Sequence, residues 1–593
     1  MLLCGEDYKN GIKEERKMYA EEKELTGYPS IDKPWLKYYS EEAINAKLPE
    51  CTIYQYLWEC NKNYLDNVAL NYFGHKITFG EMFEGIENAA KSFSAIGIKQ
   101  GDIVVMATVT TPETVYALYG LNCIGAIANM VDPRTSIEGI KEYIAEVNAE
   151  YIICIDVAYP KIEKAVADIL VKKIVVTSPA NSLLHPKKCL LQLINKLKGV
   201  TPKLSDNCIL WGDFIKYGMT KDIELVPYKK DSCCVIVHTG GTTGMPKGVM
   251  LSNDNINALV VQSVLTGIDM KREHTWLDIM PPFIAYGVGM GLHLPLIIGM
   301  ETILVPSFDA KKFDRLLDKH KPNHMVGVPS YWGTITESKK LKNADLSYII
   351  APTVGGDTMD VSLEKKANEY LEKHNCGYHI TKGYGMTEVC AGVAGTVDEN
   401  NEIGSVGVPF VKSIVSIFNF ETGEEVKYGE LGEVCISGPN IILGYYNNEE
   451  ATNDVIRVHK DGTKWVHSGD MGYMNEKGSI YIVDRVKRMI VRFDGFKVFP
   501  SLIEKVITSS PNINACCVVG IQDTTHSQGR LPIAYCVLEN DCSTTESLIR
   551  EELVHICKKG LPEYAQPMEY RFCEKLPLTP IGKVDYRKLE EIS

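Results

Sequence analysis

Apolar residues in the first part of the chain gather in short runs rich in Val and Ile, separated by stretches with helical periodicity. Such runs lie at 101–109, 151–155 and 172–178, and the stretch 111–131 has the pattern of a helix followed by another strand. Buried parallel strands have this continuous apolar character, and strands that alternate with helices form parallel sheets. The pattern therefore predicts an α/β layer from about Thr52 onward.

A second cycle of the same kind begins at the apolar run 233–237. Its later strands are expected at 274–280, 300–307, 324–330 and 348–356, and the runs end at Gly, Pro, Ser or Thr residues. In open α/β sheets the ligand collects at the carboxyl ends of the strands. The two cycles predict two αβ-layered subdomains with a nucleotide-type ligand at the strand ends.

The pattern of apolar and polar residues changes after about residue 400, where short apolar runs separated by Gly turns predict a small β-barrel subdomain. A helix at 500–510, strands at 515–521 and 532–538 and a final helix at 544–560 then predict a small C-terminal α+β domain. We expect an α/β protein with an N-terminal extension (1–50), a large N-terminal domain (51–486) and a C-terminal domain (487–593).

Composition narrows the class of protein. The chain has 593 residues, and its 63 basic and 76 acidic residues give a net charge of −13, which disfavours nucleic acid and anionic membranes as partners. The 18 cysteines form no CxxC pair, so we expect reduced thiols and a cytoplasmic location. No leader peptide and no membrane span is expected. The extension is rich in Lys and Glu, and its aromatic residues at 34–39 could dock on the core.

A loop rich in glycine and threonine follows the strand at 233–237 and is the strongest local sign of chemistry. Glycines let backbone N–H groups face a phosphate, threonine hydroxyls add donors, and the lysine adds positive charge. It is not a Walker A loop, because Pro246 precedes the lysine and Gly248 follows it. The predicted phosphate-binding residues are Thr239, Gly240, Gly241, Thr242, Thr243, Gly244 and Lys247.

The loop resembles the phosphate loop of the adenylate-forming superfamily, which includes acyl-CoA synthetases, peptide synthetase adenylation domains and firefly-type luciferases. Six further blocks resemble that superfamily in the right order and extend the resemblance over roughly residues 100–590. These blocks are Gly355-Gly356-Asp357, Gly383-Tyr384-Gly385-Met386-Thr387-Glu388, 429–433 with Gly444-Tyr445, Ser468-Gly469-Asp470, Asp484–Arg488 and 576–583.

The resemblance implies a role for each matched residue in binding ATP. Gly355, Gly356 and Asp357 would cradle adenine, and Tyr384 would stack on it. Asp470 would accept hydrogen bonds from the ribose hydroxyls, and Arg485 would reach the ribose or a phosphate. Thr387 would contact the α-phosphate. Glu388 would hold Mg²⁺, with Thr243 as a second ligand, because a hard cation prefers oxygen.

The implied reaction has two steps. A carboxylate attacks the α-phosphate of MgATP to give acyl-AMP and pyrophosphate, and a thiol then releases the acyl group from AMP. Lys583 resembles the superfamily lysine that stabilises charge in the first step. In that superfamily a mobile C-terminal domain turns between the steps about a hinge, where this chain has Arg488 in place of Asp or Lys. Gly495 would then line the path of coenzyme A.

The acid pocket implied by the resemblance includes Phe283, Ile284, Tyr286, Gly383 and Gly385. Peptide synthetase domains commonly have Asp where this chain has Ile284, so the ammonium of an amino acid would lack a partner here. Acetyl-CoA synthetases have Trp where Gly385 stands. We therefore expect an apolar acid larger than acetate, such as a medium-chain or long-chain fatty acid or an aryl acid.

Three functions stay open at this point. The first is an acid–CoA ligase that uses ATP, Mg²⁺ and coenzyme A. The second is a stand-alone adenylating enzyme that loads an acyl or aminoacyl group onto a carrier protein. The third is a nucleotide-binding protein without catalysis, which the retention of Glu388, Asp470, Arg485 and Lys583 argues against. The chain would act as a monomer or a homodimer.

Overall fold

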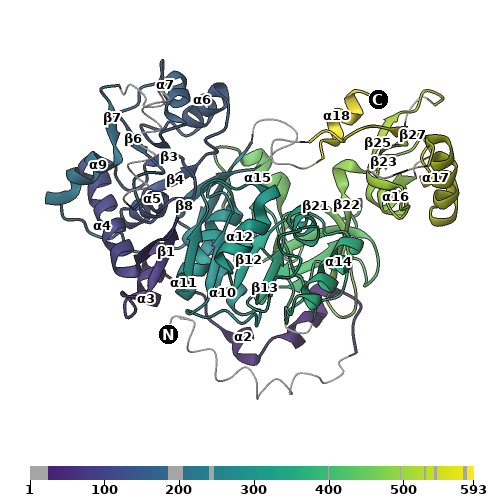
Figure 1. Cartoon of the computed structure of the whole chain (residues 1–593), viewed down its shortest axis with the longest axis horizontal. Helices are drawn as coiled ribbons and strands as arrows, with labels where there is room; N and C mark the ends of the chain where they lie inside the picture. The colour runs from purple at the N-terminus through teal and green to yellow at the C-terminus, as the bar shows by residue number, and fades with distance from the viewer. Residues whose placement is uncertain are drawn as a thin grey trace. The chain divides into compact units, whose positions relative to one another are not determined.

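The structure is a computed structural model that describes residues 24–184, 205–239, 246–397, 400–494, 496–526, 529–539, 542, 544–578 and 584–593. The chain divides into two compact units, and Figure 1 labels their helices and strands. Unit 1 comprises Met1–Val415, Ile436–His467 and Glu476–Ile480, and unit 2 comprises Ser416–Cys435, Ser468–Asn475 and Tyr481–Ser593.

Unit 1 contains a nine-stranded sheet in the order β16-β15-β14-β13-β12-β10-β11-β1-β2. The strands from β14 to β1 are parallel, and antiparallel strands close both edges. Their bounds are β1 (Val68–Tyr72), β2 (His75–Thr78), β10 (Thr275–Asp278), β11 (Glu301–Leu304), β12 (His324–Gly327), β13 (Ala351–Val354), β14 (Thr381–Tyr384), β15 (Ala394–Gly395) and β16 (Val408–Pro409).

A second sheet of unit 1 has eight strands in the order β19-β9-β8-β4-β3-β5-β6-β7. The six strands from β8 to β7 are parallel, so the predicted pair of αβ layers is confirmed. Their bounds are β3 (Ile103–Ala107), β4 (Ile127–Met130), β5 (Tyr151–Ile155), β6 (Lys173–Thr177), β7 (Cys208–Leu210), β8 (Cys233–His238), β9 (Gly248–Ser252) and β19 (Gly444–Tyr445).

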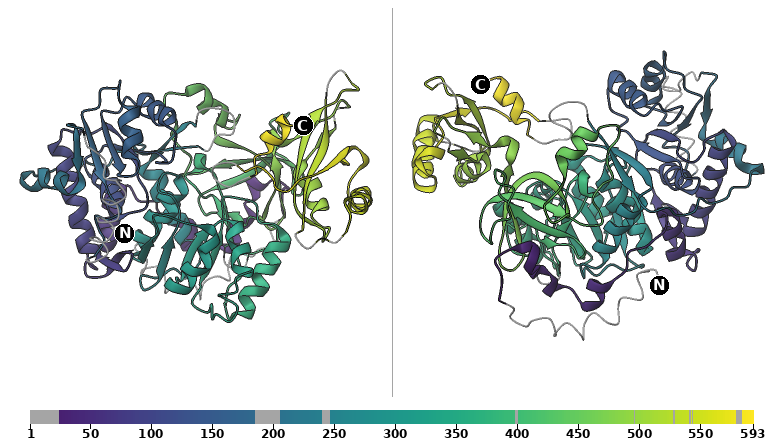
Figure 2. Two further views of the ribbon diagram at one scale, coloured as in Figure 1. Left: turned by 45° about the horizontal axis from the view of Figure 1, so that its top comes forward. Right: turned by 180° about the vertical axis from the view of Figure 1, so that it is seen from behind.

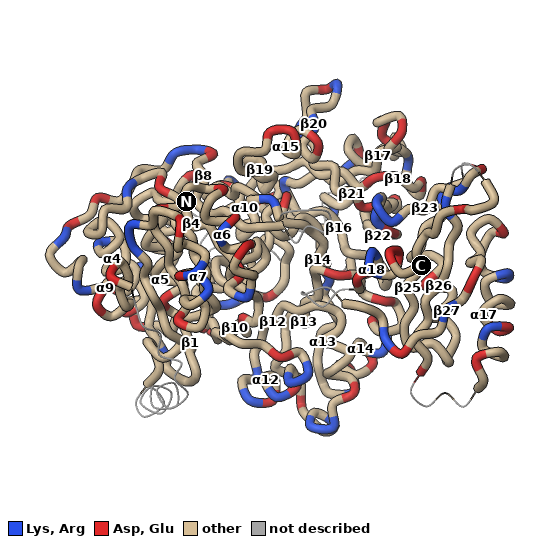
Figure 3. The backbone as a smooth tube through the Cα atoms, turned by 90° about the horizontal axis from the view of Figure 1, so that it is seen from above, with Lys and Arg blue, Asp and Glu red and all other residues tan. Residues whose placement is uncertain are grey.

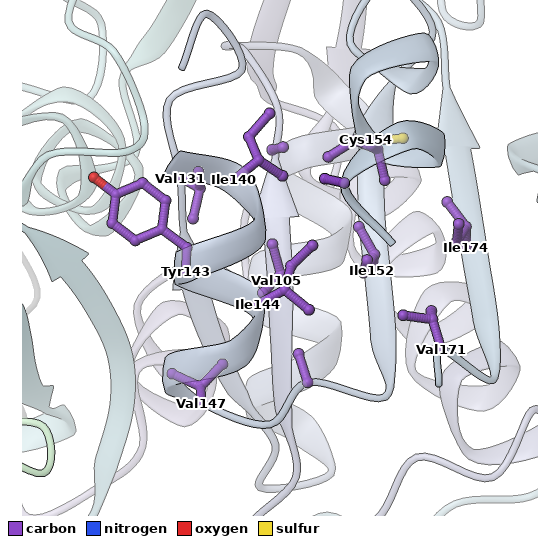
Figure 4. Close-up of a cluster of buried hydrophobic side chains, with 14 of the residues drawn as sticks. Val105, Val131, Ile140, Tyr143, Ile144, Val147, Ile152, Cys154, Val171 and Ile174 are labelled. Atoms are coloured by element: carbon purple, nitrogen blue, oxygen red, sulfur yellow. The ribbon is translucent and has the colours of Figure 1, made fainter. Parts of the chain in front are cut away.

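Buried side chains join this second sheet to the helices beside it. Val105 and Ile152 on neighbouring strands belong to one apolar cluster with Ile140 and Ile144 of α6 (Figure 4). Helix α6 spans Ile137–Glu146 and begins at Ser136, whose hydroxyl accepts from the Gly139 N–H at 3.1 Å. Positions four apart along a helix share one face, so this spacing puts α6 on the sheet.

The remaining helices of unit 1 follow the strands as the pattern predicts. They are α3 (Ile53–Asn61), α4 (Phe79–Ala95), α5 (Pro112–Cys123), α7 (Tyr159–Ala165), α9 (Trp211–Tyr217), α10 (Asn253–Val264), α11 (Leu294–Ile298), α12 (Phe313–His320), α13 (Pro329–Thr336), α14 (Val361–Lys373) and α15 (Glu449–Val455). Among the described residues, none of the helices has the length and apolar character that crossing a bilayer requires.

The N-terminal segment lies against unit 1, as its aromatic residues predict. It contains the short helices α1 (Pro29–Asp32) and α2 (Glu41–Asn45) and is the darkest ribbon in Figure 2. Trp35 is fully buried, and the Tyr39 hydroxyl donates to the Pro409 carbonyl at 2.9 Å. The docking of these aromatic residues is confirmed.

Charges of both signs are interspersed on the surface of unit 1. Basic and acidic residues alternate along α12 and the turns beside it (Figure 3), where Lys312 pairs with Asp309 at 2.8 Å and Lys340 pairs with Asp318 at 2.9 Å. Exposed pairs of this kind contribute at most about 1 kcal/mol each. The cysteines of the described residues are free thiols, as expected.

Unit 2 is built on a three-stranded sheet, β25 (Ile513–Gln522), β26 (Arg530–Leu538) and β27 (Glu569–Phe572), packed with α16 (Pro500–Ile507) and α17 (Glu546–Gly560). The prediction that α17 is the last helix is wrong, because α18 follows at Tyr586–Glu591. Helix α18 has six residues, of which only Leu589 is buried, so it is too short to show a helical period.

The β subdomain predicted after residue 400 takes the form of a five-stranded sheet. Its order is β17-β18-β21-β20, and β22 pairs with β21. Its strands are β17 (Ile414–Phe418), β18 (Gly432–Ser437), β20 (Ile456–Val458), β21 (Lys464–Met474) and β22 (Ile480–Arg485).

A buried ion pair fixes β14 within the nine-stranded sheet. The Lys382 ammonium lies 2.5 Å from a carboxylate oxygen of Glu364 on α14 and donates to the Glu402 carbonyl at 2.6 Å. The second oxygen of Glu364 accepts from the Gly404 N–H at 2.9 Å. The two side chains are 4% and 1% exposed, and burial lowers the pKa of Lys382.

We expect Lys382→Met to destabilise the protein by about 3–5 kcal/mol, because it leaves the carboxylate of Glu364 buried without its cation. Adding Glu364→Gln should restore most of the loss, since the amide oxygen can still accept from Gly404. Thermal and urea unfolding of the single and double variants measure both effects. A double variant no more stable than Lys382→Met would contradict this account.

Candidate active site

The predicted adenine site lies where β13 and β14 end side by side. The two strands are parallel, with Thr353 opposite Thr381 and Val354 opposite Lys382. Both strands therefore end at the same edge of the sheet. Gly355 follows the last residue of β13, and Tyr384 is the last residue of β14.

The backbones that leave this edge approach closely. A Cβ at Gly355 would lie 3.3 Å from the Gly383 carbonyl oxygen and 3.4 Å from the Tyr286 hydroxyl. A side chain at this position would press on backbone and on a phenol ring, so glycine permits the close approach of the two strand ends. Gly356 and Asp357 follow at the surface, and Tyr384 is half-buried. An exposed backbone turn beside a half-buried aromatic ring can receive a purine, so the residues fit ATP.

Glu388, the predicted metal ligand, is held by a tyrosine. It lies in a single helical turn, η5 (Thr387–Val389), and is 8% exposed. Its Oε1 accepts from the Tyr445 hydroxyl at 2.6 Å. Thr387 begins the same turn, so the two predicted site residues are neighbours there.

Lys247 lies over the ring of the same tyrosine, whose hydroxyl contacts Glu388. Its Nζ is 4.7 Å from the centre of the Tyr445 ring, a cation–π distance. The Thr239 N–H donates to the Lys247 carbonyl at 3.1 Å, and the Lys247 N–H donates to Thr239 Oγ1 at 3.3 Å, so the two ends of the phosphate loop are tied together. The following predicted residues lie outside the described part of the chain: Gly240, Gly241, Thr242, Thr243, Gly244, Gly495 and Lys583.

The donor set suits magnesium. Tyr445 takes one carboxylate oxygen of Glu388, which orients the group and leaves Oε2 as the oxygen that can meet a metal ion. Hard divalent cations bind carboxylate oxygen and keep phosphate oxygens as their other ligands. Glu388 therefore fits Mg²⁺ carried in on ATP.

The predicted acid-pocket residues Phe283, Ile284 and Tyr286 lie just before a π-helical segment, η3 (Gly287–His293). A Cβ at Gly287 would lie 1.8 Å from the Pro281 carbonyl oxygen, so only glycine permits this tight turn. Single π-helical segments inside α-helices often mark functional sites.

The three side chains are partly exposed and differ in their surroundings. Burial of its phenol raises the pKa of Tyr286 above its ordinary value. The Arg134 guanidinium lies 5.7 Å from the centre of the Phe283 ring.

Backbone packing explains why residue 385 is a glycine, which the sequence alone does not reveal. A Cβ there would lie 1.7 Å from the Ala391 carbonyl oxygen, so any side chain would collide with backbone. Cys390 and Ala391 have positive φ angles of 53° and 92°, a conformation that is rare outside glycine. A Cβ at Gly383, by contrast, would meet nothing nearer than 3.9 Å.

Two buried titratable groups next to the acid-pocket segment escaped sequence reasoning. His293 Nε2 lies 3.0 Å from Asn257 Oδ1 and its Nδ1 lies 2.9 Å from the Tyr119 hydroxyl, and burial lowers its pKa to about 3. Asp278 ends β10, and burial raises its pKa to about 8. Its Oδ1 accepts from the Met280 N–H at 3.1 Å, and its Oδ2 is buried without a hydrogen-bond partner. The position of Asp278 inside the apolar run 274–280 could have indicated a buried carboxyl group.

The predicted ribose-binding residues meet within unit 2. Arg485 Nε lies 2.6 Å from Asp470 Oδ1 on the neighbouring strand. Asp470 is 4% exposed, and its N–H donates to Ser468 Oγ at 3.0 Å, whereas the Arg485 side chain is 55% exposed. The arginine therefore orients the carboxylate and keeps part of its guanidinium in solvent.

Arg488, at the predicted hinge position, is anchored by acidic residues of unit 2. It pairs closely with Glu504 and lies 3.8 Å from Asp484, and its guanidinium is 5.5 Å from the centre of the Tyr586 ring. Burial alone would lower the pKa of Arg488, but Glu504 and Asp484 raise it above its ordinary value. The two carboxylates explain why this position accepts arginine.

Comparisons with known proteins agree with this architecture. Residues 57–446 match the family model of AMP-binding enzymes, and residues 502–583 match that of the AMP-binding enzyme C-terminal domain. The chain therefore belongs to the AMP-binding enzyme family, the adenylate-forming enzymes that its motifs resemble.

Two curated relatives illustrate the match. The long-chain-fatty-acid–CoA ligase of Bacillus subtilis (strain 168) is 29% identical over 564 residues, which cover 94% of this chain and 98% of the relative. The probable 4-coumarate–CoA ligase 2 of Dictyostelium discoideum is 30% identical over 570 residues, with the same two coverages.

A solved structure of ATP-bound MatB from Rhodopseudomonas palustris has a TM-score of 0.78 at 20% identity and covers 92% of this chain and 99% of its own. A benzoate CoA ligase from Burkholderia xenovorans LB400 has a TM-score of 0.74, also at 20% identity, and covers 91% of this chain and 99% of its own. These two likenesses confirm the predicted fold class.

Asp278 generates a pH prediction. Its pKa is about 8 in the folded protein and near 3.8 when exposed, so its contribution to stability is complete below pH 4 and is lost as the pH rises to about 8. The wild type should lose about 1.4 kcal/mol per pH unit relative to Asp278→Asn over that range.

Thermal melts of the two proteins at several pH values measure this slope. Asp206→Asn, which changes an exposed aspartate, is the control and should follow the wild type. A stability difference between wild type and Asp278→Asn that does not change with pH would refute the assignment.

Proposed function

We propose that the chain is an ATP-dependent carboxylic acid–CoA ligase that acts through an acyl-AMP intermediate. The carboxylate attacks the α-phosphorus of ATP and pyrophosphate leaves, and the thiol of coenzyme A then attacks the acyl carbonyl and AMP leaves. The observation that carries the proposal is the grouping of Glu388, Tyr445 and Lys247, two of which sequence motifs assign to metal and phosphate. Relatives that match along 98% of their length are named as acid–CoA ligases, which supports it.

In the first step, the strand end at Gly355, Gly356 and Asp357 would receive adenine, with Tyr384 against the ring. Bound Mg²⁺ would neutralise phosphate charge and make pyrophosphate a better leaving group. Glu388 would hold that ion through Oε2, and Lys247 would face the departing pyrophosphate. Such transfers are catalysed mainly by positioning and electrostatics, which is what these residues supply.

Asp470 and Arg485 would bind the ribose. Asp470 is already oriented by Arg485 and buried, so its carboxylate can accept from two hydroxyls at little entropic cost. Lys583 would stabilise charge as the acid meets the α-phosphate.

For the second step, we propose that the C-terminal domain, residues 487–593, turns about Arg488 and brings Gly495 to the path of coenzyme A. The ion pair of Arg488 with Glu504 lies within the turning domain and would be kept, whereas its 3.8 Å contact with Asp484 crosses the hinge and would be lost in the turn.

We propose an apolar acid as substrate, a medium-chain or long-chain fatty acid or an aryl acid. Ile284 offers no charge to an ammonium group. The named substrates of the two relatives, a long-chain fatty acid and 4-coumarate, fall in these two classes.

The alternative is transfer of the acyl group to a carrier protein. It needs the same first step and differs only in the thiol that accepts the product. Release of free acyl-CoA in the presence of coenzyme A would favour the ligase, and acylation of a carrier protein alone would favour the alternative.

A panel of carboxylic acids tests the substrate class. We expect pyrophosphate release with medium-chain and long-chain fatty acids or aryl acids to exceed that with acetate by more than about tenfold. The apolar part of these acids gains binding free energy from each methylene that the pocket buries. Addition of coenzyme A should convert the product to thioester. The proposal fails if no acid in the panel causes ATP turnover.

Lys583→Ala tests the division of labour between the two steps. We expect adenylation to fall by about 10²–10³, while thioester formation from supplied acyl-AMP is retained. Lys575→Ala, which changes an exposed lysine nearby, is the control and should keep both steps. Equal loss of the two steps in Lys583→Ala would show that Lys583 has no special role in the first.

A further inference from the structure

Tyr445 lies between two residues that motifs assign to the chemistry but has no assigned role of its own. It is 6% exposed, its hydroxyl donates to Glu388 Oε1 at 2.6 Å, and Lys247 Nζ lies 4.7 Å from the centre of its ring. The edge of one ring thus holds a carboxylate, and its face holds an ammonium group.

The Tyr445 hydroxyl is the donor in this contact, because a carboxylate can only accept and a phenol ordinarily keeps its proton. The 2.6 Å separation falls in the range of charge-assisted O–H···O⁻ bonds, which are stronger than bonds between neutral groups. The bond therefore restricts the rotamers of Glu388 and occupies Oε1.

The position of the ring is set by the strand that follows the phosphate loop. Tyr445 lies opposite Val249 in the antiparallel pair of β19 and β9, and β9 begins at Gly248, directly after Lys247. The Tyr445 N–H also donates to Thr452 Oγ1 at 2.9 Å. Backbone pairing therefore holds the ring beside the chain that leaves Lys247.

The turn that carries Glu388 is fastened to the same segment. The Ile442 N–H donates to the Glu388 carbonyl at 3.3 Å, and Asn440 Nδ2 donates to the Val389 carbonyl at 3.0 Å. Asn440 is fully buried. The segment 440–445 thus holds both the backbone and the side chain of Glu388.

We propose that Tyr445 is a positioning residue that sets the metal-binding carboxylate and the phosphate-binding lysine at a fixed separation, so that a divalent cation and its nucleotide phosphates are received together. The inference rests on the proposed function and deepens it. Without the hydroxyl, Glu388 would have other rotamers available, and the cation would bind with a larger entropic cost.

Tyr445→Phe removes the hydroxyl and keeps the ring that Lys247 faces. We expect the dissociation constant of Mn²⁺·ATP, followed by the electron paramagnetic resonance signal of free Mn²⁺, to rise about tenfold, because one hydrogen bond to a charged group is lost. Binding of ATP in the presence of EDTA should stay within about twofold, since Lys247 keeps its place on the ring. Thioester formation from supplied acyl-AMP should also be unchanged.

Tyr446→Phe is the matched control. It removes a hydroxyl from the neighbouring half-buried tyrosine and should leave Mn²⁺·ATP binding as in the wild type. In a Glu388→Gln background, Tyr445→Phe should add no further loss of Mn²⁺·ATP binding, because the charged acceptor is already gone.

Three results would overturn the proposal: unchanged Mn²⁺·ATP affinity in Tyr445→Phe, equal weakening with and without the cation, or additive losses in the double variant. If Tyr445→Phe melts well below the wild type, Glu388→Gln alone decides, since it should lose the cation-dependent part of ATP binding only. Binding is measured without acid or coenzyme A, so failure of the ligase assignment would appear separately, as absence of turnover in the wild type.

Discussion

The parallel pairing of β13 with β14 sets the spacing on which the rest of the site depends. Because the carboxyl ends of parallel strands meet at one edge of a sheet, Gly355 and Tyr384 both follow the paired strands at the same edge. A shift of β14 against β13 would be destabilising, because β14 carries the buried Lys382. Its ammonium group is compensated only by contact with Glu364 of α14 and the Glu402 carbonyl. A one-residue slip would bury an unpaired cation.

The chain departs from this regular sheet at one strained turn. Past the end of β14, Gly385 passes against the Ala391 carbonyl, and Cys390 and Ala391 both have positive φ. Non-glycine residues in such conformations cost about 1–3 kcal/mol each, and they persist where surrounding contacts fix them. Here those contacts include Asn440, which donates to the carbonyls of Val389 and Gly392 at 3.0 and 2.7 Å. Stored strain therefore lies next to Glu388, where the carboxylate must be presented in one orientation.

Sequence patterns predicted the elements better than the contacts between them. The strands around 101–109, 151–155 and 348–356 and the two αβ layers are present, because apolar runs and glycine turns are local signals. The bond from Tyr445 to Glu388 could not be predicted, because nothing in either local sequence specifies a partner so distant along the chain. The same holds for the pairing of Arg488 with Glu504, where the sequence indicated only an unusual residue at a hinge. Helix α18 was missed since a single buried leucine gives no period.

The electrostatics of unit 1 agree with the uncharged acyl group proposed for the substrate. Around the segment from β10 to the end of η3, burial keeps His293 deprotonated, Asp278 protonated up to about pH 8 and Tyr286 in its phenol form. Each of these groups is neutral at physiological pH because charging it would require desolvating an ion. A charged substituent on the acid would face the same penalty, and the Arg134 guanidinium over the Phe283 ring is already paired with Asp132 at 2.7 Å. At Tyr445 the opposite holds, since Glu388 and Lys247 meet on one ring, so charge is concentrated where we propose that the nucleotide phosphates and the metal ion bind.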